Sequence, residues 1–236
     1  MRREIQADSH DFALYLVGDF LRNSNLQYVS FYYSLTAQLI GNRPPAVESL
    51  FKIRMLSERI CSDCRHVHTS DPSDDVGLQL SLTDHTTSVH HTTIDECVRG
   101  HFATQTIRDA RCDNCRKTVS TKTFAFDTAP EVLIVQLKRF VYNRRNRMSK
   151  DESPISYGEY LDLTPYAKDE SLNQQQGVIQ YKLHGVVAHD GELNAGHYIA
   201  YARGPHGWAG FDDDRRVWDC TLGEALDPKD DFTPYI

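Results

Sequence analysis

The sequence lacks any long hydrophobic run, because no stretch of 18 consecutive apolar residues occurs in its 236 residues. A helix that crosses a membrane needs about 20 such residues, so we expect no membrane partner. The N-terminal residues Met1–Glu4 lead into the polar segment Gln6–Asp11 and lack the apolar centre of a secretory signal peptide. These absences predict an intracellular protein, located in the cytoplasm, the nucleus or both.

An excess of positive charge is also missing. The chain has 26 Lys and Arg against 33 Asp and Glu, which gives a formal net charge of −7. Nucleic-acid-binding proteins usually present a basic face, so we expect no nucleic-acid partner. The middle of the chain is instead rich in acidic residues, namely Asp71, Asp74, Asp75, Asp84, Asp95 and Glu96. This acidity indicates an ordinary solvated surface or, more weakly, a surface for a basic protein segment.

Apolar residues are not scarce overall. Hydrophobic residues make up 40% of the chain and charged residues 25%, a composition too apolar for a disordered protein. No internal repeat is visible. The length suits one sizeable globular domain or two small ones.

The pattern along the chain changes from helical to strand-like. Residues 12–21 have apolar side chains at helical spacing after the cap candidates Asp8 and Ser9, and 28–60 indicate helical or mixed stretches broken at 41–45. Later, strict alternation over 77–82 predicts a half-buried strand. Further elements are expected as follows: a helix over 94–102, a buried central strand over 132–140, strands over 118–127, 157–163, 180–188, 197–202 and 216–219, a loop over 143–151, and a linker over 172–177. The whole predicts an α+β domain with a mainly antiparallel sheet.

Four of the six cysteines form two Cys-x-x-Cys pairs, Cys61 with Cys64 and Cys112 with Cys115, separated by 47 residues. Each pair can hold one side of a tetrahedral ion, and four thiolates leave no open position, so we expect a structural zinc. A redox pair and unmetallated core cysteines are the alternatives. Four histidines are alternative ligands that four thiolates make unnecessary: His66, His68, His90 and His91.

The segments 181–191, 196–201 and 208–214 together are typical of the His/Asp half of a thiol-protease site. An imidazole acts as a general base only when a neighbour fixes its tautomer. Asp212 is the candidate for that neighbour of His197, and His189 is expected to be a second, structural histidine near the site.

These segments and others make the chain resemble the ubiquitin-specific proteases over essentially its full length. Five segments carry the resemblance in the family's order: Gln6–Phe12, the two Cys-x-x-Cys pairs, Leu137–Phe140, Leu161–Tyr166, and Gly196–Tyr198 with Phe211–Asp213. The resemblance implies a papain-like cysteine protease fold shaped as fingers, palm and thumb. It implies one domain over 1–236, with the remaining thumb helices in 1–60, the zinc-bearing β fingers in 61–125 and the antiparallel palm in 126–236.

The resemblance also implies roles for individual residues. His197 would be the catalytic base, Asp212 would orient it, and Asp213 would support the site. Gln6, Asp8 and Tyr198 would bind the substrate, where a carboxylate can pair with the arginines of ubiquitin's C-terminal tail. Zinc on Cys61, Cys64, Cys112 and Cys115 would be the cofactor, and ubiquitin or ubiquitinated proteins the partners.

The family's nucleophile lies in an N-terminal Asn-x-Gly-Asn-Thr-Cys segment that does not occur in this sequence. Cys97 falls where a small buried residue is expected, and Cys220 would approach from the wrong side of the cleft. We therefore expect a truncated thumb and a chain that is inactive, or active only with a supplied N-terminal piece or partner. The exposed thumb remnant would include Phe12, Leu16 and Phe20, each costing about 1.5–3 kcal/mol of lost burial.

Two functional hypotheses follow. The first is a deubiquitinase, which hydrolyses isopeptide bonds at the ubiquitin C-terminus. The second is a catalytically dead ubiquitin-binding module.

Overall fold

The computed structural model describes residues 50–84, 87–142, 148–168, 177–192, 195–213, 216–228 and 232–235. The predicted helix over 12–21, the substrate contacts Gln6 and Asp8, and the thumb remnant lie outside these residues, as does nearly all of the predicted linker. None of the helices in the described part is both long and apolar enough to cross a membrane.

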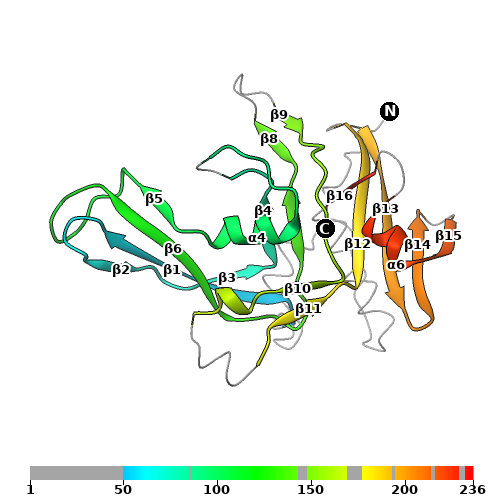
Figure 1. The fold of residues 1–236 in the computed structure, drawn as a ribbon, viewed down its shortest axis with the longest axis horizontal. Helices are drawn as coiled ribbons and strands as arrows, with labels where there is room; N and C mark the ends of the chain where they lie inside the picture. Colours follow the sequence, from blue (N-terminus) through cyan, green and yellow to red (C-terminus); the bar gives the residue numbers. More distant parts are fainter. Residues whose placement is uncertain are drawn as a thin grey trace, which may run out of the picture.

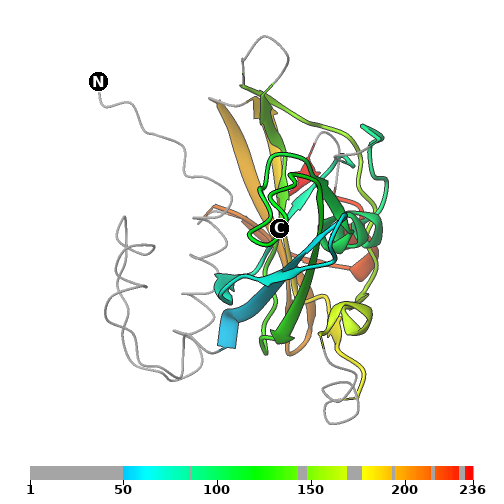
Figure 2. The ribbon, with the colours of Figure 1, turned by 90° about the vertical axis from the view of Figure 1, so that its left-hand side faces the viewer.

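A long antiparallel arm extends to one side of the molecule (Figure 1). Its centre is β1 (Lys52–Cys61) paired with β6 (Ser120–Thr128), and β2 (Val67–Thr69), β3 (Ser73–Val76) and β5 (Gln105–Ile107) complete the sheet in the order β2-β1-β6-β5, with β3 also on β1. Figure 2 views the molecule along this arm. The helical or mixed prediction for 28–60 was wrong over 52–60, because pairing with β6 outweighs the local pattern.

The base of the arm packs around α4 (Ile94–Phe102), which begins at a capping box formed by Thr93 and Glu96. Cys97, Val98 and Phe102 are buried on its inner face. They share one hydrophobic core with Leu78 and Leu80 of β4 (Leu78–Ser81). The predicted helix and the predicted half-buried strand are both confirmed here.

The apolar run over 132–140 is not one buried strand, so that prediction was wrong. Only β7 (Val135–Lys138) forms, paired in parallel with β4 on one side, and Val132 is 39% exposed. At Arg139 the chain turns, with its N–H donating to Leu137 O at 2.9 Å, and continues as β8 (Phe140–Tyr142). The predicted loop over 143–151 was also wrong in part, because β9 (Met148–Lys150) pairs with β8.

Arg139 explains this turn physically. Its side chain is fully buried, and its guanidinium donates to the carbonyl oxygens of Pro234, Asp151 and Ser153 at 2.7–2.9 Å. A buried charge needs such partners, so the backbone bends to bring three separate carbonyls to one side chain.

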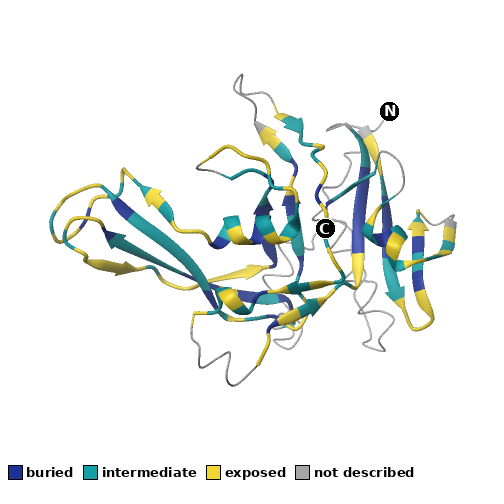
Figure 3. Ribbon diagram, viewed as in Figure 1, coloured by how far each residue is buried: buried dark blue, intermediate teal, exposed yellow. Residues whose placement is uncertain are grey.

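The second sheet, the palm, is antiparallel with the order β15-β14-β13-β12-β16. Its strands are β12 (Gly185–Glu192), β13 (Ala195–Gly204), β14 (Gly207–Asp212), β15 (Arg216–Cys220) and β16 (Thr233–Pro234). Burial is concentrated in β12 and β13 (Figure 3), where Val186, Ala188 and Tyr201 lie in one core. Strand β14 and the short helix α6 (Leu222–Leu226) were not predicted.

Tyr235, directly after β16, connects the palm sheet with the strand pair of β4 and β7. Its N–H donates to Val187 O of β12 at 2.8 Å, and its carbonyl accepts from Leu137 N–H of β7 at 2.9 Å. A separate ribbon of β10 (Tyr160–Asp162) and β11 (Gln180–Lys182), with the 3-10 turn η1 (Thr164–Tyr166), lies at the base of the arm. The predicted region boundaries at 60/61 and 125/126 fall inside β1 and β6, so the strands run on through them.

Candidate active site

His197 and Asp212 come from neighbouring strands of the palm. Ala200 of β13 pairs with Phe211 of β14, which brings His197, three residues before Ala200, to the same end of the sheet as Asp212. His197 Nε2 lies 2.5 Å from Asp212 Oδ1. The two side chains are 45% and 30% exposed, so a reacting group can approach the pair from solvent.

This contact fixes what the imidazole can do. With Nε2 donating its proton to the carboxylate, the neutral ring carries its lone pair on Nδ1. Nδ1 is therefore the nitrogen that can take a proton from a neighbouring nucleophile. The structure brings the predicted base and the predicted orienting residue together, and their catalytic roles remain predictions.

Asp213 lies in the turn that follows β14, in the left-handed conformation with φ of 50°, which Asp tolerates better than most residues. Its carboxylate, that of Asp212 and the His197 ring offer ligand atoms within 4.8 Å of one another. Asp213 thus lies beside the pair, as a supporting residue would.

Tyr198 is half-buried, and its ring faces inward. It packs against the His189 ring at a centroid distance of 4.4 Å and edge-on against Tyr235 at 6.3 Å. The ring thereby supports the strand that carries His197. The predicted contact of Tyr198 with substrate remains a prediction.

His189 is 1% exposed in β12, as expected of a structural histidine. Burial lowers the pKa of His189 to about 4, and the nearby positive charge of Lys150 adds to the effect. Its ring also dictates the glycine before His197, because an ideal Cβ on Gly196 would lie 2.3 Å from both His189 Nε2 and Asp190 O. The sequence pattern indicated His189 and Gly196, and it placed Arg139 within the predicted buried strand over 132–140. It gave no indication of the carbonyl contacts that Arg139 and Lys150 make.

The four paired cysteines meet at the tip of the arm. Cys61 Sγ lies 3.5 Å from Cys115 Sγ, and Cys64 Sγ lies 3.6 Å from Cys112 Sγ. Thiolates 2.3 Å from a tetrahedral zinc would be about 3.8 Å apart, and all four sulfurs lie within 4.8 Å of one another. None is in a disulfide, so the four residues together could hold a metal ion.

The backbone of the two pairs repeats the same turn. Arg65 N–H donates to Cys61 O and Arg116 N–H to Cys112 O, and these two arginines have φ of 60° and 66°. The alternative ligands His66 and His68 are exposed, and His90 and His91 are outside the four-sulfur group. The structure therefore favours a closed site of four thiolates.

All six cysteines lie within the described residues, and none of them faces His197. Cys97 is buried in α4, where burial raises the pKa of its thiol to about 11. Cys220 pairs with Trp208, whereas Asp212 pairs with Arg216. Four residues of strand separate Cys220 from Arg216, or about 13 Å, so Cys220 lies at the other end of β14.

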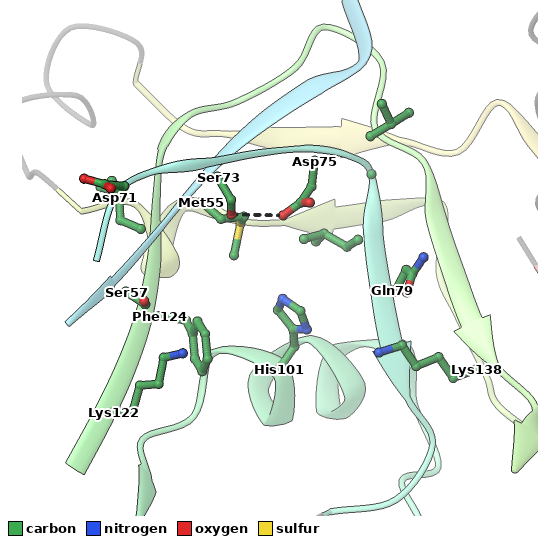
Figure 4. A pocket seen from close by; sticks show the side chains of 14 residues that line it. Met55, Ser57, Asp71, Ser73, Asp75, Gln79, His101, Lys122, Phe124 and Lys138 are labelled. Atoms are coloured by element: carbon green, nitrogen blue, oxygen red, sulfur yellow. Dashed lines mark hydrogen bonds between the residues drawn. The ribbon is translucent and has the colours of Figure 1, made fainter. Parts of the chain in front are cut away.

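A cavity of about 480 Å³ lies at the base of the arm, away from this pair. Figure 4 shows Lys122 and Lys138 on either side of His101, and Asp71 and Asp75 on the opposite wall. Burial and the charge of Lys138 lower the pKa of His101. None of the residues that form the His197 site lines this cavity.

Comparisons with known proteins find a family model and relatives that match the sequence. Residues 1–230 match the family model described as ubiquitin carboxyl-terminal hydrolase. Ubiquitin carboxyl-terminal hydrolase 36 of Drosophila willistoni is 31% identical over 214 residues, which are 88% of this chain and 15% of that protein. Ubiquitin carboxyl-terminal hydrolase 10 of Saccharomyces cerevisiae is 40% identical over 106 residues, 44% of this chain and 13% of that protein. The chain thus spans less than a fifth of these relatives.

Solved structures share the fold. A SAGA DUB module with Ubp8, Sgf11, Sus1 and Sgf73, bound to monoubiquitin, matches with a TM-score of 0.72 at 23% identity, over 98% of this chain and 49% of that one. The same kind of module bound to ubiquitin aldehyde gives 0.70 at 23% identity, over 98% and 48%. The likeness confirms the predicted fold class.

Proposed function

We propose, because the chain belongs to the ubiquitin carboxyl-terminal hydrolase family, that its residues supply the general base for thiol-dependent hydrolysis at the C-terminus of ubiquitin. The contact between His197 Nε2 and Asp212 Oδ1 carries the proposal. His197 Nδ1 takes the proton of a cysteine thiol, and the thiolate attacks the carbonyl of ubiquitin's C-terminal glycine. The imidazolium then donates this proton to the lysine amine as the C–N bond breaks, and water hydrolyses the resulting thioester to release ubiquitin and the thiol.

Ubiquitin as the substrate is supported by the two solved modules, which are bound to monoubiquitin and to ubiquitin aldehyde. The nucleophile of the proposed reaction comes from polypeptide other than these 236 residues. All six cysteines lie in the described part, and they are in the four-sulfur site, in the core of α4, or at the far end of β14. A preceding segment or a partner that covers the thumb would supply the thiol.

The proposed metal on the four thiolates is zinc, in a structural role. A zinc with four protein ligands offers no position for water or substrate, and contributes by joining the two hairpins that carry the pairs. Reduced thiolates persist in the cytoplasm and the nucleus, and we place the protein in one or both of these compartments.

A second function, a ubiquitin-binding module without catalysis, is favoured by the absence of a thiol beside His197. The two functions differ in the need for His197. Binding to a surface formed by palm and fingers does not require an imidazole base, whereas hydrolysis does.

The first experiment uses ubiquitin with a thiol-reactive electrophile at its C-terminus and weighs the product by intact mass spectrometry. For the 236-residue chain we expect no adduct, while NMR titration with unmodified ubiquitin shows saturable binding. An adduct mapped to Cys220 or Cys97 would contradict the assignment of the nucleophile. Absence of binding would contradict both functions.

A second experiment distinguishes the two functions. It uses the longer protein encoded by any in-frame coding sequence upstream of Met1. If that protein forms an adduct and cleaves ubiquitin conjugates, His197→Ala should remove the cleavage, and the matched control His184→Ala, at an exposed site, should not. Cleavage that survives His197→Ala excludes the proposed base. Binding by every variant without cleavage by any of them favours the non-catalytic module.

A further inference from the structure

We propose that Lys150 is a positioning residue for His197. Its buried ammonium binds the edge of β12 where no strand of the described residues pairs, and it thereby fixes the hairpin that carries the imidazole. The inference rests on the proposed role of His197 as the base.

Lys150 reaches β12 from the neighbouring hairpin of β8 and β9. Its Nζ donates to Gly191 O at 2.9 Å and to His189 O at 3.3 Å, and its side chain is only 3% exposed. Carbonyls two residues apart in a strand point toward the same edge. The ammonium therefore binds β12 along the edge that faces away from β13.

In the described part of the chain, a strand pairs with that edge only as far as His189. Strand β16 pairs with β12 at Ala188 and His189, and Thr233 Oγ1 also donates to His189 O at 3.0 Å. Beyond this point no described strand continues along the edge, although β13 stays paired on the other side as far as Glu192. Within the described residues, Lys150 Nζ donates the hydrogen bond that Gly191 O accepts.

The two bonded carbonyls belong to the residues on either side of Asp190, which lies across the hairpin from His197. Asp190 pairs with His197 and Gly191 pairs with Gly196. The two strands approach closely there, since even a methyl group on Gly196 would overlap His189 and Asp190. A shift of residues 189–191 must therefore move 196–197, and with them the contact of His197 with Asp212.

The surroundings of Lys150 are not those of a stabilising ion pair. Its carboxylate partner Glu152, at 3.5 Å, is 68% exposed, and the Tyr235 ring lies 5.9 Å from Nζ. Surface pairs of this kind contribute little, whereas burying an ammonium costs free energy. Replacement by an apolar side chain of similar length should thus spare the overall fold. It would remove the Lys150 donor from Gly191 O and leave His189 O with the hydroxyl of Thr233.

The test compares Lys150→Met with the matched control Lys182→Met, a lysine that is 42% exposed and pairs with Glu159. In the 236-residue chain, ¹⁵N NMR of the imidazoles reports the His197 tautomer, and hydrogen exchange reports the amides of 189–197. In Lys150→Met we expect averaging of the Nδ1 and Nε2 signals and about tenfold faster exchange in this hairpin. Exchange in α4 and the metal content should stay unchanged, and the control should match the parent.

A single fixed tautomer and unchanged exchange in folded Lys150→Met would overturn the proposal, as would the same changes in Lys182→Met. If Lys150→Met does not fold, the parent decides: a slowly exchanging ammonium signal from Lys150 in contact with Gly191 supports the proposal, and its absence overturns it. Ubiquitin binding is measured in parallel. Loss of binding in the parent would count against the proposed function, while the tautomer data would still decide the role of Lys150.

Discussion

The tip of the arm and the centre of the palm are both antiparallel sheet, yet they are organised by different means. Along β1, the side chains from Ser57 to Ile60 are only half-buried, and burial returns at Cys61, opposite buried Ser120. In the palm, Val186, Ala188 and Tyr201 are almost completely buried in a continuous core. The arm thus relies on its four thiolates where the palm relies on packing, and damage to the two regions should be separable.

Removal of the proposed zinc should have the largest effect, and a local one. We expect a strong chelator, or Cys112→Ser, to abolish protection from hydrogen exchange over the distal halves of β1 and β6, because apparent binding energies of structural zinc are about 10–16 kcal/mol. The amides of β12 and β13 should keep their protection from hydrogen exchange. Cys97→Ser is the control outside the metal site. Equal loss of protection in the arm and the palm would contradict the claim that the two regions are stabilised separately.

Acid should act on the palm through His189. Its folded pKa of about 4 lies below the ordinary value of 6.5, so the unfolded state binds a proton first as the pH falls. The contribution of neutral, buried His189 to the free energy of unfolding is therefore complete above pH 6.5. It is lost as the pH falls from 6.5 to about 4, and its size is up to about 3 kcal/mol. Urea unfolding of the parent and of His189→Gln measures it as the difference in pH dependence. Identical pH profiles would refute it.

Gly196→Ala should destabilise the hairpin by about 1–3 kcal/mol, because the new Cβ would lie 2.3 Å from a backbone oxygen and from the His189 ring. Gly158→Ala, whose nearest such contact is 3.8 Å, is the control. Thermal unfolding measures both variants. If Gly196→Ala were as stable as Gly158→Ala, the His189 ring and the β12 backbone would have to move aside at little cost in free energy.

Asp212 variants should change the site without changing stability. In Asp212→Asn the amide oxygen can still accept from His197 Nε2, so the tautomer should remain fixed. Asp212→Ala removes the acceptor, and the ¹⁵N signals of the ring should average. NMR of the imidazole distinguishes them, and averaging in the Asn variant would show that the carboxylate charge is needed.

The smallest effect concerns thiol reactivity. With the proposed zinc bound, a small alkylating reagent at neutral pH should modify Cys220 and spare Cys97, because burial raises the pKa of Cys97 to about 11. After chelation the four paired cysteines should react as well. Peptide mapping by mass spectrometry counts the modified sites. Early reaction of Cys97 would show that the base of the arm opens with the tip.

Local patterns in the sequence were enough for α4, β4, the cysteine cluster and the pairing of His197 with Asp212. They failed where tertiary contacts decide. Residues 52–61 became a strand through β6, and the run over 132–140 was broken by Arg139, whose acceptors Asp151, Ser153 and Pro234 are distant in the chain. The burial of Lys150 likewise depends on carbonyls of another hairpin.

The position of β16 in the chain gives the fold an order of assembly. Tyr235 and β16 follow every other described element, yet they bond to both β7 and β12. During synthesis on the ribosome, chain emerges from the N-terminus onward, so β12 has an open edge and Arg139 lacks its Pro234 acceptor until residues 232–235 appear. The sheet that holds His197 is therefore completed late, after the arm has already been made.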